Sequence, residues 1–460
     1  MPVKLLIIGL DCAEPSLVFE RWRQDLPNLS RLMNQGTYGR LESCIPAITV
    51  PAWSCLLSGR DPGELGIYGF RNRADRSYNQ MAIANSHSVK FPRLWNYLSD
   101  AGWKVVVVNV PGTYPPQLVN GALVSGCLTP DTTTQFTHPP SLGEQVAAWV
   151  ERYRFDVENF RSHDKNRILK DIYDLCNQTF TLALNLQAKY DPDFLMLVEL
   201  GLDRVHHAFW KYMDSRHPLH EPGSPLANVI YDYYCHLDRS LGKLLAACED
   251  ATVLVVSDHG AQPLMGGFCL NQWLIQEGYL KLAETPEKPA FLEQVAVDWP
   301  QTQAWGAGGY YGRIFLNVQG REPQGTIPLS DYEAVRDRLV ARLEAIPGSD
   351  GQPLGVAAYR PQQLYQRVRG IAPDLIVYFQ NLAWRSVGTI GLPSLYTLEN
   401  DTGPDDANHA QHGLLIFCDP HQPGRGEIDG CQLYDILPTL LSRYQLEIPS
   451  ELRGETLFLS

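Results

Sequence analysis

The chain has 460 residues, of which 44% are hydrophobic and 19% are charged. A chain of this size and composition can bury a large core, which excludes intrinsic disorder and favours one enlarged domain or two closely packed ones. The formal net charge of -13 argues against a nucleic acid polymer or an anionic membrane as a main partner, because phosphate groups repel a diffusely acidic surface. An anionic substrate would therefore need a local source of positive charge.

Cysteine usage and the first residues bear on the compartment of the protein. The ten cysteines are scattered singly without a CxxC pair, as expected for reduced and mostly buried thiols. The opening MPVKLLIIGLDCAEP has an apolar run that ends at Asp11, too short for a signal peptide or a membrane span. We therefore expect a cytoplasmic protein without a membrane span. The oligomeric state stays open.

Apolar runs alternate with amphipathic stretches along the chain. The short runs are typical of strands buried on both faces, and the longer stretches, with apolar residues at intervals of three and four, are typical of helices. This alternation predicts an α/β fold with a doubly wound, mostly parallel sheet and helices on both faces. In chain order the expected strands are Lys4–Leu10, Lys104–Val110, Phe194–Leu200, Thr252–Ser257 and Leu414–Cys418, and the clearest helices are Ile168–Lys189 and Leu226–Cys248.

Residues 266–401 differ in character from the rest of the chain. They contain many glycine and proline turns and a strand-like run at Gly312–Val318. We predict that they form a smaller inserted lid subdomain, and that residues 1–265 and 402–460 form the core. The turn-rich segment Tyr396–Asn408 is expected to be a mobile loop beside the active site.

Acidic residues follow three of the expected strands. Asp11 follows the first, Asp203 follows the strand that ends at Leu200, and Asp258 follows the strand that ends at Ser257. Ligands bind at the carboxyl ends of strands in open α/β sheets, so these three carboxylates are candidates for a common site. Each aspartate taken singly could instead be a turn former or a helix cap.

Histidines accompany these carboxylates. His207 lies four residues after Asp203, so that on a helix both side chains point the same way, whereas His206 has the wrong helical phase. Six oxygen and nitrogen ligands suit two divalent ions, zinc or alternatively manganese, and three carboxylates against two such ions leave about one positive charge to hold a phosphate. The proposed ligands are Asp11, Asp203, His207, Asp258, His259 and His409.

A hydroxyl nucleophile is expected in the segment CIPAITVPAWSCLL. Thr49 precedes Pro51 and an apolar stretch that predicts a helix, which places Thr49 at the helix N-terminus. Free backbone N–H groups and the helix dipole favour phosphate and an alkoxide there. Thr49 could instead merely cap the helix, and Ser54 and Ser58 are rival hydroxyls within or beyond it.

Five motifs in order, GLDCAEP, PAITVPAW, LDRVHHAFW, VVSDHG and NHAQHG, carry a family resemblance. The chain resembles the type I phosphodiesterase/nucleotide pyrophosphatase branch of the alkaline phosphatase superfamily. The resemblance implies an alkaline-phosphatase-like core and a small phosphorylated substrate. It also implies that Thr49 attacks phosphorus, giving a phospho-threonine that water then hydrolyses. The implied ligands of the metal beside the nucleophile are Asp11, Thr49, Asp258 and His259, and those of the second metal are Asp203, His207 and His409.

One departure from the family pattern leaves the substrate class open. Similar diesterases often carry an asparagine just after the segment that corresponds to LGIYG at residues 65–69, where it helps to bind a phosphate oxygen, and Phe70 occupies that register here. Asn72 or Arg71 could replace the missing donor, and Asn72 is our candidate substrate-binding residue. The alternatives to a diesterase are a phosphomonoesterase or phosphate mutase of the same superfamily and a catalytically idle metal-binding protein.

Overall fold

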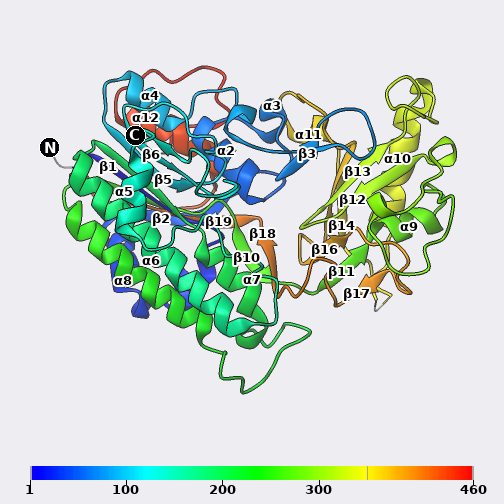
Figure 1. Cartoon of the computed structure of the whole chain (residues 1–460), viewed down its shortest axis with the longest axis horizontal. Helices are drawn as coiled ribbons and strands as arrows, with labels where there is room; N and C mark the ends of the chain where they lie inside the picture. Colours follow the sequence, from blue (N-terminus) through cyan, green and yellow to red (C-terminus); the bar gives the residue numbers. More distant parts are fainter. Residues whose placement is uncertain (1–2, 350, 458–460) are drawn as a thin grey trace.

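The computed structural model describes residues 3–349 and 351–457. The ribbon has a larger part, which carries both ends of the chain, and a smaller part that contains α9 and α10 (Figure 1). A ten-stranded sheet forms the centre of the larger part, with β1, β8, β9, β5 and β6 parallel to one another and β19 antiparallel to its neighbours β9 and β2. The sheet is thus mostly parallel, and the α/β prediction is confirmed.

The five strands expected from the sequence all lie inside this sheet. They are the strands β1 (Leu5–Leu10), β5 (Val105–Val110), β8 (Phe194–Glu199), β9 (Thr252–Val256) and β19 (His412–Cys418). The remaining strands of the sheet are β2 (Thr37–Glu42), β6 (Gly121–Ser125), β7 (Thr137–His138), β20 (Gly426–Glu427) and β21 (Cys431–Gln432).

Helices cover both faces of the sheet because its central strands are apolar on both sides. In β1, Leu6 and Ile8 belong to one hydrophobic cluster, whereas Leu5 and Ile7 belong to another on the opposite face. The first cluster packs against α1 (Pro27–Gln35), α5 (Leu142–Trp149), α6 (Lys165–Tyr190), α7 (Gly201–Met213) and α8 (Val229–Ala247), and the second against α2 (Thr49–Ser58), α4 (Leu94–Asp100) and α12 (Ile436–Arg443). The fold is therefore doubly wound, as expected.

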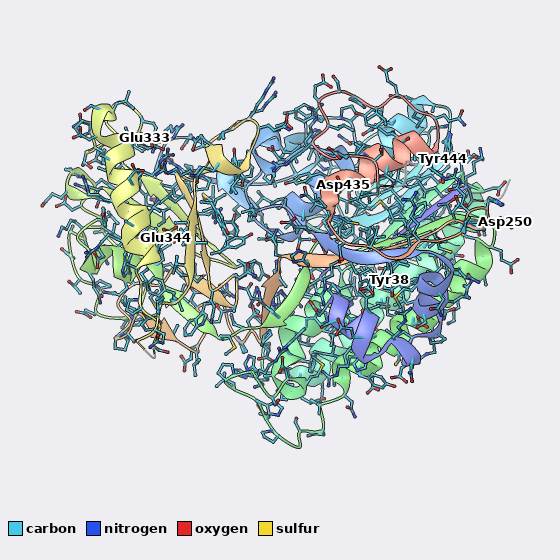
Figure 2. All side chains as sticks on the ribbon, turned by 180° about the vertical axis from the view of Figure 1, so that it is seen from behind. Tyr38, Asp250, Glu333, Glu344, Asp435 and Tyr444 are labelled. Atoms are coloured by element: carbon cyan, nitrogen blue, oxygen red, sulfur yellow. The ribbon has the colours of Figure 1, made fainter. Side chains whose placement is uncertain are left out.

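A second sheet forms the smaller part of the molecule, which we call the lid. All of its strands lie within the inserted segment predicted from the sequence, and the helices α9 and α10 and a hydrophobic cluster of its own complete it. Seen from behind, α10 runs along the outer side of the lid, with Glu333 and Glu344 near its ends (Figure 2). The subdomain boundaries at 266 and 401 stay a prediction. The elements of the lid are β11 (Gly266–Cys269), α9 (Leu270–Gln276), β12 (Ala304–Ala307), β13 (Gly312–Leu316), α10 (Tyr332–Glu344), β14 (Val356–Tyr359), α11 (Pro361–Leu364), β15 (Leu375–Phe379), β16 (Trp384–Val387) and β17 (Tyr396–Thr397).

The lid contacts the segment of the core that precedes α2. A cluster of buried tyrosine and aliphatic side chains joins the two parts. Within it, the Tyr378 hydroxyl accepts a hydrogen bond of 2.8 Å from the backbone N–H of Ala47, and the Tyr365 hydroxyl donates one of 2.8 Å to the Ile45 carbonyl. The start of α2 is thus held by side chains of the lid.

Between the two sheets, β10 (Gly260–Pro263) and β18 (Ala407–Ala410) form a two-stranded antiparallel ribbon. The segment 396–408, expected to be a mobile loop, contains β17 and the start of β18. The chain thus passes through β18 of this ribbon before it enters β19 of the core sheet.

Two further sequence expectations concern cysteines and membranes. All ten cysteines are unpaired, and nine of them are buried. Across residues 3–349 and 351–457, no helix is both long enough and apolar enough to cross a membrane.

We predict that Tyr378→Phe lowers the free energy of unfolding by about 1–3 kcal/mol, because it leaves the buried Ala47 N–H without an acceptor. Urea unfolding followed by circular dichroism measures the change. The matched control is Tyr359→Phe, since the Tyr359 ring packs edge-on against Tyr378 and its hydroxyl has no hydrogen bond within the described part of the chain. Equal stability of the two variants would contradict the prediction.

Candidate metal centre

Three neighbouring parallel strands place the three predicted aspartates at one edge of the sheet. The strands β8, β1 and β9 are adjacent in that order. Asp11 directly follows β1, Asp203 lies in the first turn of α7 after β8, and Asp258 lies just beyond β9. All three side chains are fully buried. Parallel strands end at the same edge, so the topology alone brings together residues far apart in the sequence.

The ribbon of β10 and β18 positions the two candidate histidines that do not lie on α7, His259 and His409. His409 lies on β18 opposite Ala261 of β10, and β10 directly follows His259. The rings of His259 and His409 stack with their centroids 3.8 Å apart. This stack places the predicted ligands of the two metals side by side.

The six predicted metal ligands form two groups whose ligand atoms lie within 4.8 Å of one another inside each group. In the first group, His259 Nε2 lies 3.8 Å from Asp11 Oδ1 and 3.1 Å from Asp258 Oδ2. In the second, Asp203 Oδ1 lies 3.3 Å from His207 Nε2 and 3.6 Å from His409 Nε2. The grouping is the one that the family resemblance implied.

Neighbouring groups orient the residues of the first group. The indole N–H of Trp53 donates a hydrogen bond of 2.8 Å to Asp11 Oδ2, and the backbone N–H of Cys12 donates one of 3.2 Å to Asp258 Oδ1. The other oxygen of each carboxylate is left facing His259. Such outer contacts are the usual means by which proteins orient metal ligands.

A wider network of ionic and hydrogen-bonded contacts orients the second group. His207 Nδ1 lies 2.6 Å from Asp405 Oδ1, and His409 Nδ1 lies 2.9 Å from the carbonyl oxygen of Ala47. The guanidinium group of Arg204 contacts Asp203 Oδ2. Each Nε2 and the remaining Asp203 oxygen therefore point toward a common centre.

The hydrogen bonding of the inward-facing ligand atoms indicates whether the site suits metal ions. Five buried atoms of the two groups have no hydrogen-bond partner among the described residues. A buried polar atom without a partner is unfavourable, and five such acceptor atoms converging on two points are what two bound cations would satisfy. The donor set of carboxylate oxygens and imidazole nitrogens fits divalent metals. The five atoms are Asp11 Oδ1, Asp203 Oδ1, His207 Nε2, Asp258 Oδ2 and His409 Nε2.

The two groups differ in charge balance. Burial raises the pKa of Asp11 and of Asp258 well above the usual value, and nearby carboxylates raise both further. Burial also acts to raise the pKa of Asp203, but His207 and Arg204 outweigh it and hold that pKa well below its usual range. In their ionised forms the two carboxylates of the first group would have no positive charge beside them to compensate their own, and a cation between them would supply it.

Thr49 is the first residue of α2 and lies beside the first group, as predicted. Its Oγ1 lies 3.4 Å from His259 Nε2. The N-cap residue of α2 is Ile48, which makes no capping hydrogen bond, and within the described part of the chain the Thr49 hydroxyl has a hydrogen-bond contact with His259 and none with the start of the helix. The Ser58 hydroxyl, in contrast, donates a hydrogen bond to the Ser54 carbonyl within the helix.

Three further residues considered in the sequence lie outside both groups. His206 is buried against the rings of Trp210 and Tyr234, and His412 is exposed at the start of β19. Asn72 lies on β3 (Arg71–Arg73), where its amide accepts a hydrogen bond of 2.7 Å from Tyr68 N–H and donates one of 3.0 Å to the Gly69 carbonyl. Its side chain thus closes a turn, and its substrate-binding role stays a prediction.

Sequence reasoning missed Asp405 and the contact of Tyr310 with a candidate metal ligand. Asp405 is fully buried and ion-paired with Arg161 and Arg385 as well as with His207. The Tyr310 ring from the lid stacks on His409 with centroids 4.1 Å apart. Two consecutive aspartates before a histidine motif were the signal for Asp405, and a single sequence cannot distinguish them from a solvated turn.

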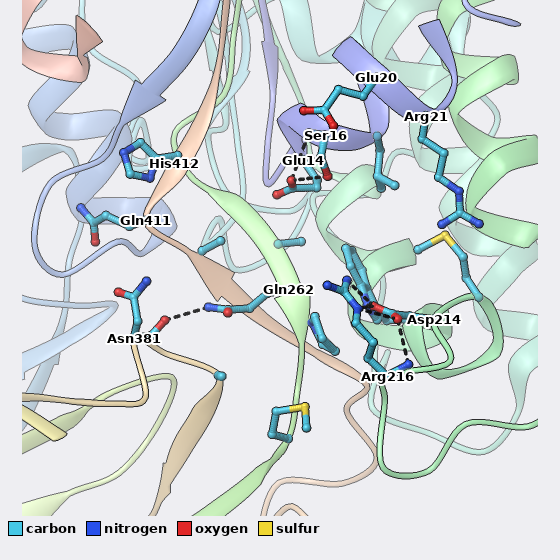
Figure 3. A pocket seen from close by; sticks show the side chains of 18 of the residues that line it. Glu14, Ser16, Glu20, Arg21, Asp214, Arg216, Gln262, Asn381, Gln411 and His412 are labelled. Carbon is cyan, nitrogen blue, oxygen red and sulfur yellow. Dashed lines mark hydrogen bonds and ion pairs between the residues drawn. The ribbon is translucent and has the colours of Figure 1, made fainter. Parts of the chain in front are cut away.

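A cavity borders the same ribbon without including the candidate ligands. It has a volume of about 1050 Å³. Gln262 of β10 extends into it and donates a hydrogen bond to the Asn381 carbonyl, while Glu14, Arg216 and His412 lie around it (Figure 3). Its lining mixes acidic and basic side chains, and none of the eight predicted site residues is part of it.

The fold and the site together define an alkaline-phosphatase-like enzyme with two candidate metal positions. The chain belongs to the type I phosphodiesterase/nucleotide pyrophosphatase family, whose sequence profile matches residues 5–405. This family is metal-dependent, and the chain is accordingly a phosphodiesterase/nucleotide pyrophosphatase-like hydrolase. No curated protein sequence matches it significantly.

Solved structures share the fold at low sequence identity. Human ectonucleotide pyrophosphatase/phosphodiesterase 5 is 14% identical with a TM-score of 0.56, covering 97% of this chain and 96% of that one. Phosphonoacetate hydrolase from Sinorhizobium meliloti, in complex with phosphonoacetate, is 15% identical with a TM-score of 0.60, covering 95% and 94%. An inactive form of murine ectonucleotide pyrophosphatase/phosphodiesterase 5 in complex with AMP is 14% identical with a TM-score of 0.56, covering 97% of this chain and 96% of that one.

We predict that Asp405→Asn weakens binding of one of two divalent ions about 10- to 100-fold, because the uncharged amide no longer fixes and polarises His207. Competition with a chromophoric chelator measures both affinities. Asp401→Asn is the matched control, since Asp401 lies in the same segment and contacts Gly388 and Thr389 instead of a histidine. Unchanged affinities in Asp405→Asn would rule out this orienting role.

Proposed function

We propose that this chain is a two-metal hydrolase that cleaves phosphodiester or nucleotide pyrophosphate bonds through a phospho-threonine intermediate. The observation that carries the proposal is the convergence, beside Thr49 at the start of a helix, of five buried acceptor atoms that lack a partner among the described residues. The family supports hydrolysis of phosphate esters, and this arrangement supports the assignment of roles.

Thr49 is the nucleophile in this proposal. Its Oγ1 loses its proton and attacks phosphorus, and the bond from phosphorus to the leaving oxygen breaks, so that the leaving group departs with that oxygen and a phospho-threonine remains. Water then attacks phosphorus, the bond from phosphorus to Oγ1 breaks, and the phosphate or nucleotide is released as the threonine hydroxyl re-forms. The N-terminal position of Thr49 on α2 supplies backbone N–H groups and a positive dipole end, which favour an alkoxide and the oxygens of a bound phosphoryl group.

Divalent ions held by the two groups would stabilise negative charge on the attacking and leaving oxygens. We assign Asp11, Asp258 and His259, together with Thr49, to one ion, and Asp203, His207 and His409 to the other. Three histidine nitrogens among six protein ligands favour zinc, and manganese is the alternative.

The proposed substrate is small and the proposed compartment is the cytoplasm. The AMP complex of murine ectonucleotide pyrophosphatase/phosphodiesterase 5 favours a nucleotide ester among the candidates. The ten unpaired cysteines fit a reducing compartment. The net charge of -13 disfavours a nucleic acid polymer as a substrate.

Metal-dependent hydrolysis of three chromogenic esters tests the proposed reaction. The esters are bis-p-nitrophenyl phosphate, p-nitrophenyl phosphate and the p-nitrophenyl ester of thymidine 5′-phosphate, and the chelated protein is reconstituted in turn with zinc, manganese and magnesium. We expect the diesters to be cleaved faster than the monoester, with zinc most effective. Preference for the monoester would favour a phosphomonoesterase, and silence with all three metals bound would contradict the proposal.

We further predict that Thr49→Ala lowers kcat by roughly 10³-fold or more, because it removes the nucleophile. Metal content by elemental analysis should change little, since the candidate carboxylate and imidazole ligands remain. Thr49→Ser is the matched control and should retain measurable turnover. Wild-type activity in Thr49→Ala would refute the mechanism.

A further inference from the structure

A second cavity lies between the core and the lid and is lined by arginines. It has a volume of about 580 Å³, within the usual range for small-molecule sites. One wall is the hairpin of β3 and β4 (Met81–Ile83) from the core, and the facing wall comes from β12, β13 and β16 of the lid. Arg71, Arg73, Arg313 and Arg385 all line it, and the acidic residues on its wall are Glu293 and Asp401, so four positive charges face two negative ones. In a chain of net charge -13, this is a local concentration of positive charge.

Two of these arginines have no carboxylate partner. Across the described residues, neither Arg71 nor Arg313 forms an ion pair; Arg313 donates a hydrogen bond of 2.6 Å to the Arg71 carbonyl. Arg71 is exposed, and Arg313 is half-buried. Their charges are therefore available to a ligand.

The other two arginines share their carboxylate partners with other cations. Arg73 pairs with Glu322 at 3.2 Å, but Arg76 and Arg321 contact the same carboxylate. Both Arg73 and Arg385 are buried, and each keeps a buried Nε–H without a hydrogen-bond partner among the described residues. A buried donor without an acceptor is unfavourable, and a bound anion would supply one.

Arg385 also pairs with a shared carboxylate, and this pair connects the cavity to the candidate metal centre. Arg385 Nη1 lies 3.1 Å from Asp405 Oδ2, and the other oxygen of Asp405 lies 2.6 Å from His207 Nδ1. The Arg385 guanidinium also lies over the Tyr310 ring, which stacks on His409. The cavity is therefore connected through Asp405 to the second metal group, which the family resemblance places on the leaving-group side.

From this geometry we infer that the cavity binds an anionic group, a carboxylate or a phosphate, carried by the leaving group of the substrate. The inference rests on the proposed hydrolase function and adds the substrate class to it. The buried rings of Trp305 and Phe315 give the cavity an apolar wall beside the arginines. A leaving group with a flat apolar body and an acidic end matches both features.

The first test compares two esters that differ in leaving-group charge. The p-carboxyphenyl and p-carbamoylphenyl esters of thymidine 5′-phosphate share the nucleotide and differ in one negative charge. We expect the metal-loaded enzyme to prefer the acidic ester, and Arg313→Gln to lower the ratio of the two kcat/KM values about tenfold, the effect of losing one charge-assisted hydrogen bond. Arg71→Gln, with an exposed side chain, serves if Arg313→Gln fails to fold.

Arg338→Gln is the matched control, because Arg338 is exposed on α10 of the same lid and forms no ion pair within the described part of the chain. It should leave the ratio at the wild-type value. A ratio that Arg71→Gln and Arg313→Gln leave unchanged would overturn the inference, while cleavage of the neutral ester would keep the proposed function intact.

A binding measurement decides the inference separately from turnover. The metal-loaded full chain is titrated calorimetrically with 4-hydroxybenzoate and, separately, with inorganic phosphate. The dissociation constant should be about tenfold larger in Arg313→Gln than in Arg338→Gln. A loss with 4-hydroxybenzoate alone supports a carboxylate-bearing leaving group, and a loss with phosphate alone supports a phosphorylated one. No loss with either anion overturns the inference, even if both esters are hydrolysed.

Discussion

Burial of three carboxylates at one edge of a sheet is the constraint on which the rest of this structure depends. Asp11, Asp203 and Asp258 are fully buried, and an ionised carboxylate without compensation is costly in such a place. The fold compensates each one differently. Asp203 has Arg204 and His207 beside it, whereas Asp11 and Asp258 have hydrogen bonds from an indole and a backbone N–H, which leaves their charge to be met by cations.

The same constraint explains why the lid is joined closely to the core. Asp405 forms ion pairs with Arg161 of the core and Arg385 of the lid, and it orients His207. Tyr310 from the lid covers the His409 ring. The segment before α2, which positions Thr49, is held by lid tyrosines. A displacement of the lid would therefore disturb the orientation of the metal ligands and not only the entrance to the site.

The cavity lined by arginines extends this arrangement away from the reacting atoms. Arg385 belongs both to the network that orients His207 and to the wall of the cavity. A charged ligand in the cavity would thus interact with Arg385, and Arg385 contacts the second metal group through one carboxylate, that of Asp405. Binding of a distant part of a substrate and the geometry at the metal centre are in this way physically connected.

The sequence by itself determined the elements and the chemistry of the site. Apolar runs specify strands such as β1 and β9 because burial on both faces leaves no room for polar residues, and the spacing of Asp203 and His207 places both on one helix face. Only the tertiary structure decided that Asp405 orients His207 and that His409 stacks on His259, because these contacts join segments whose relative positions depend on packing. The ordered contacts within 396–408 and the local use of the Asn72 amide were likewise set by neighbours distant in the sequence or by turn geometry, which no pattern along a single chain records.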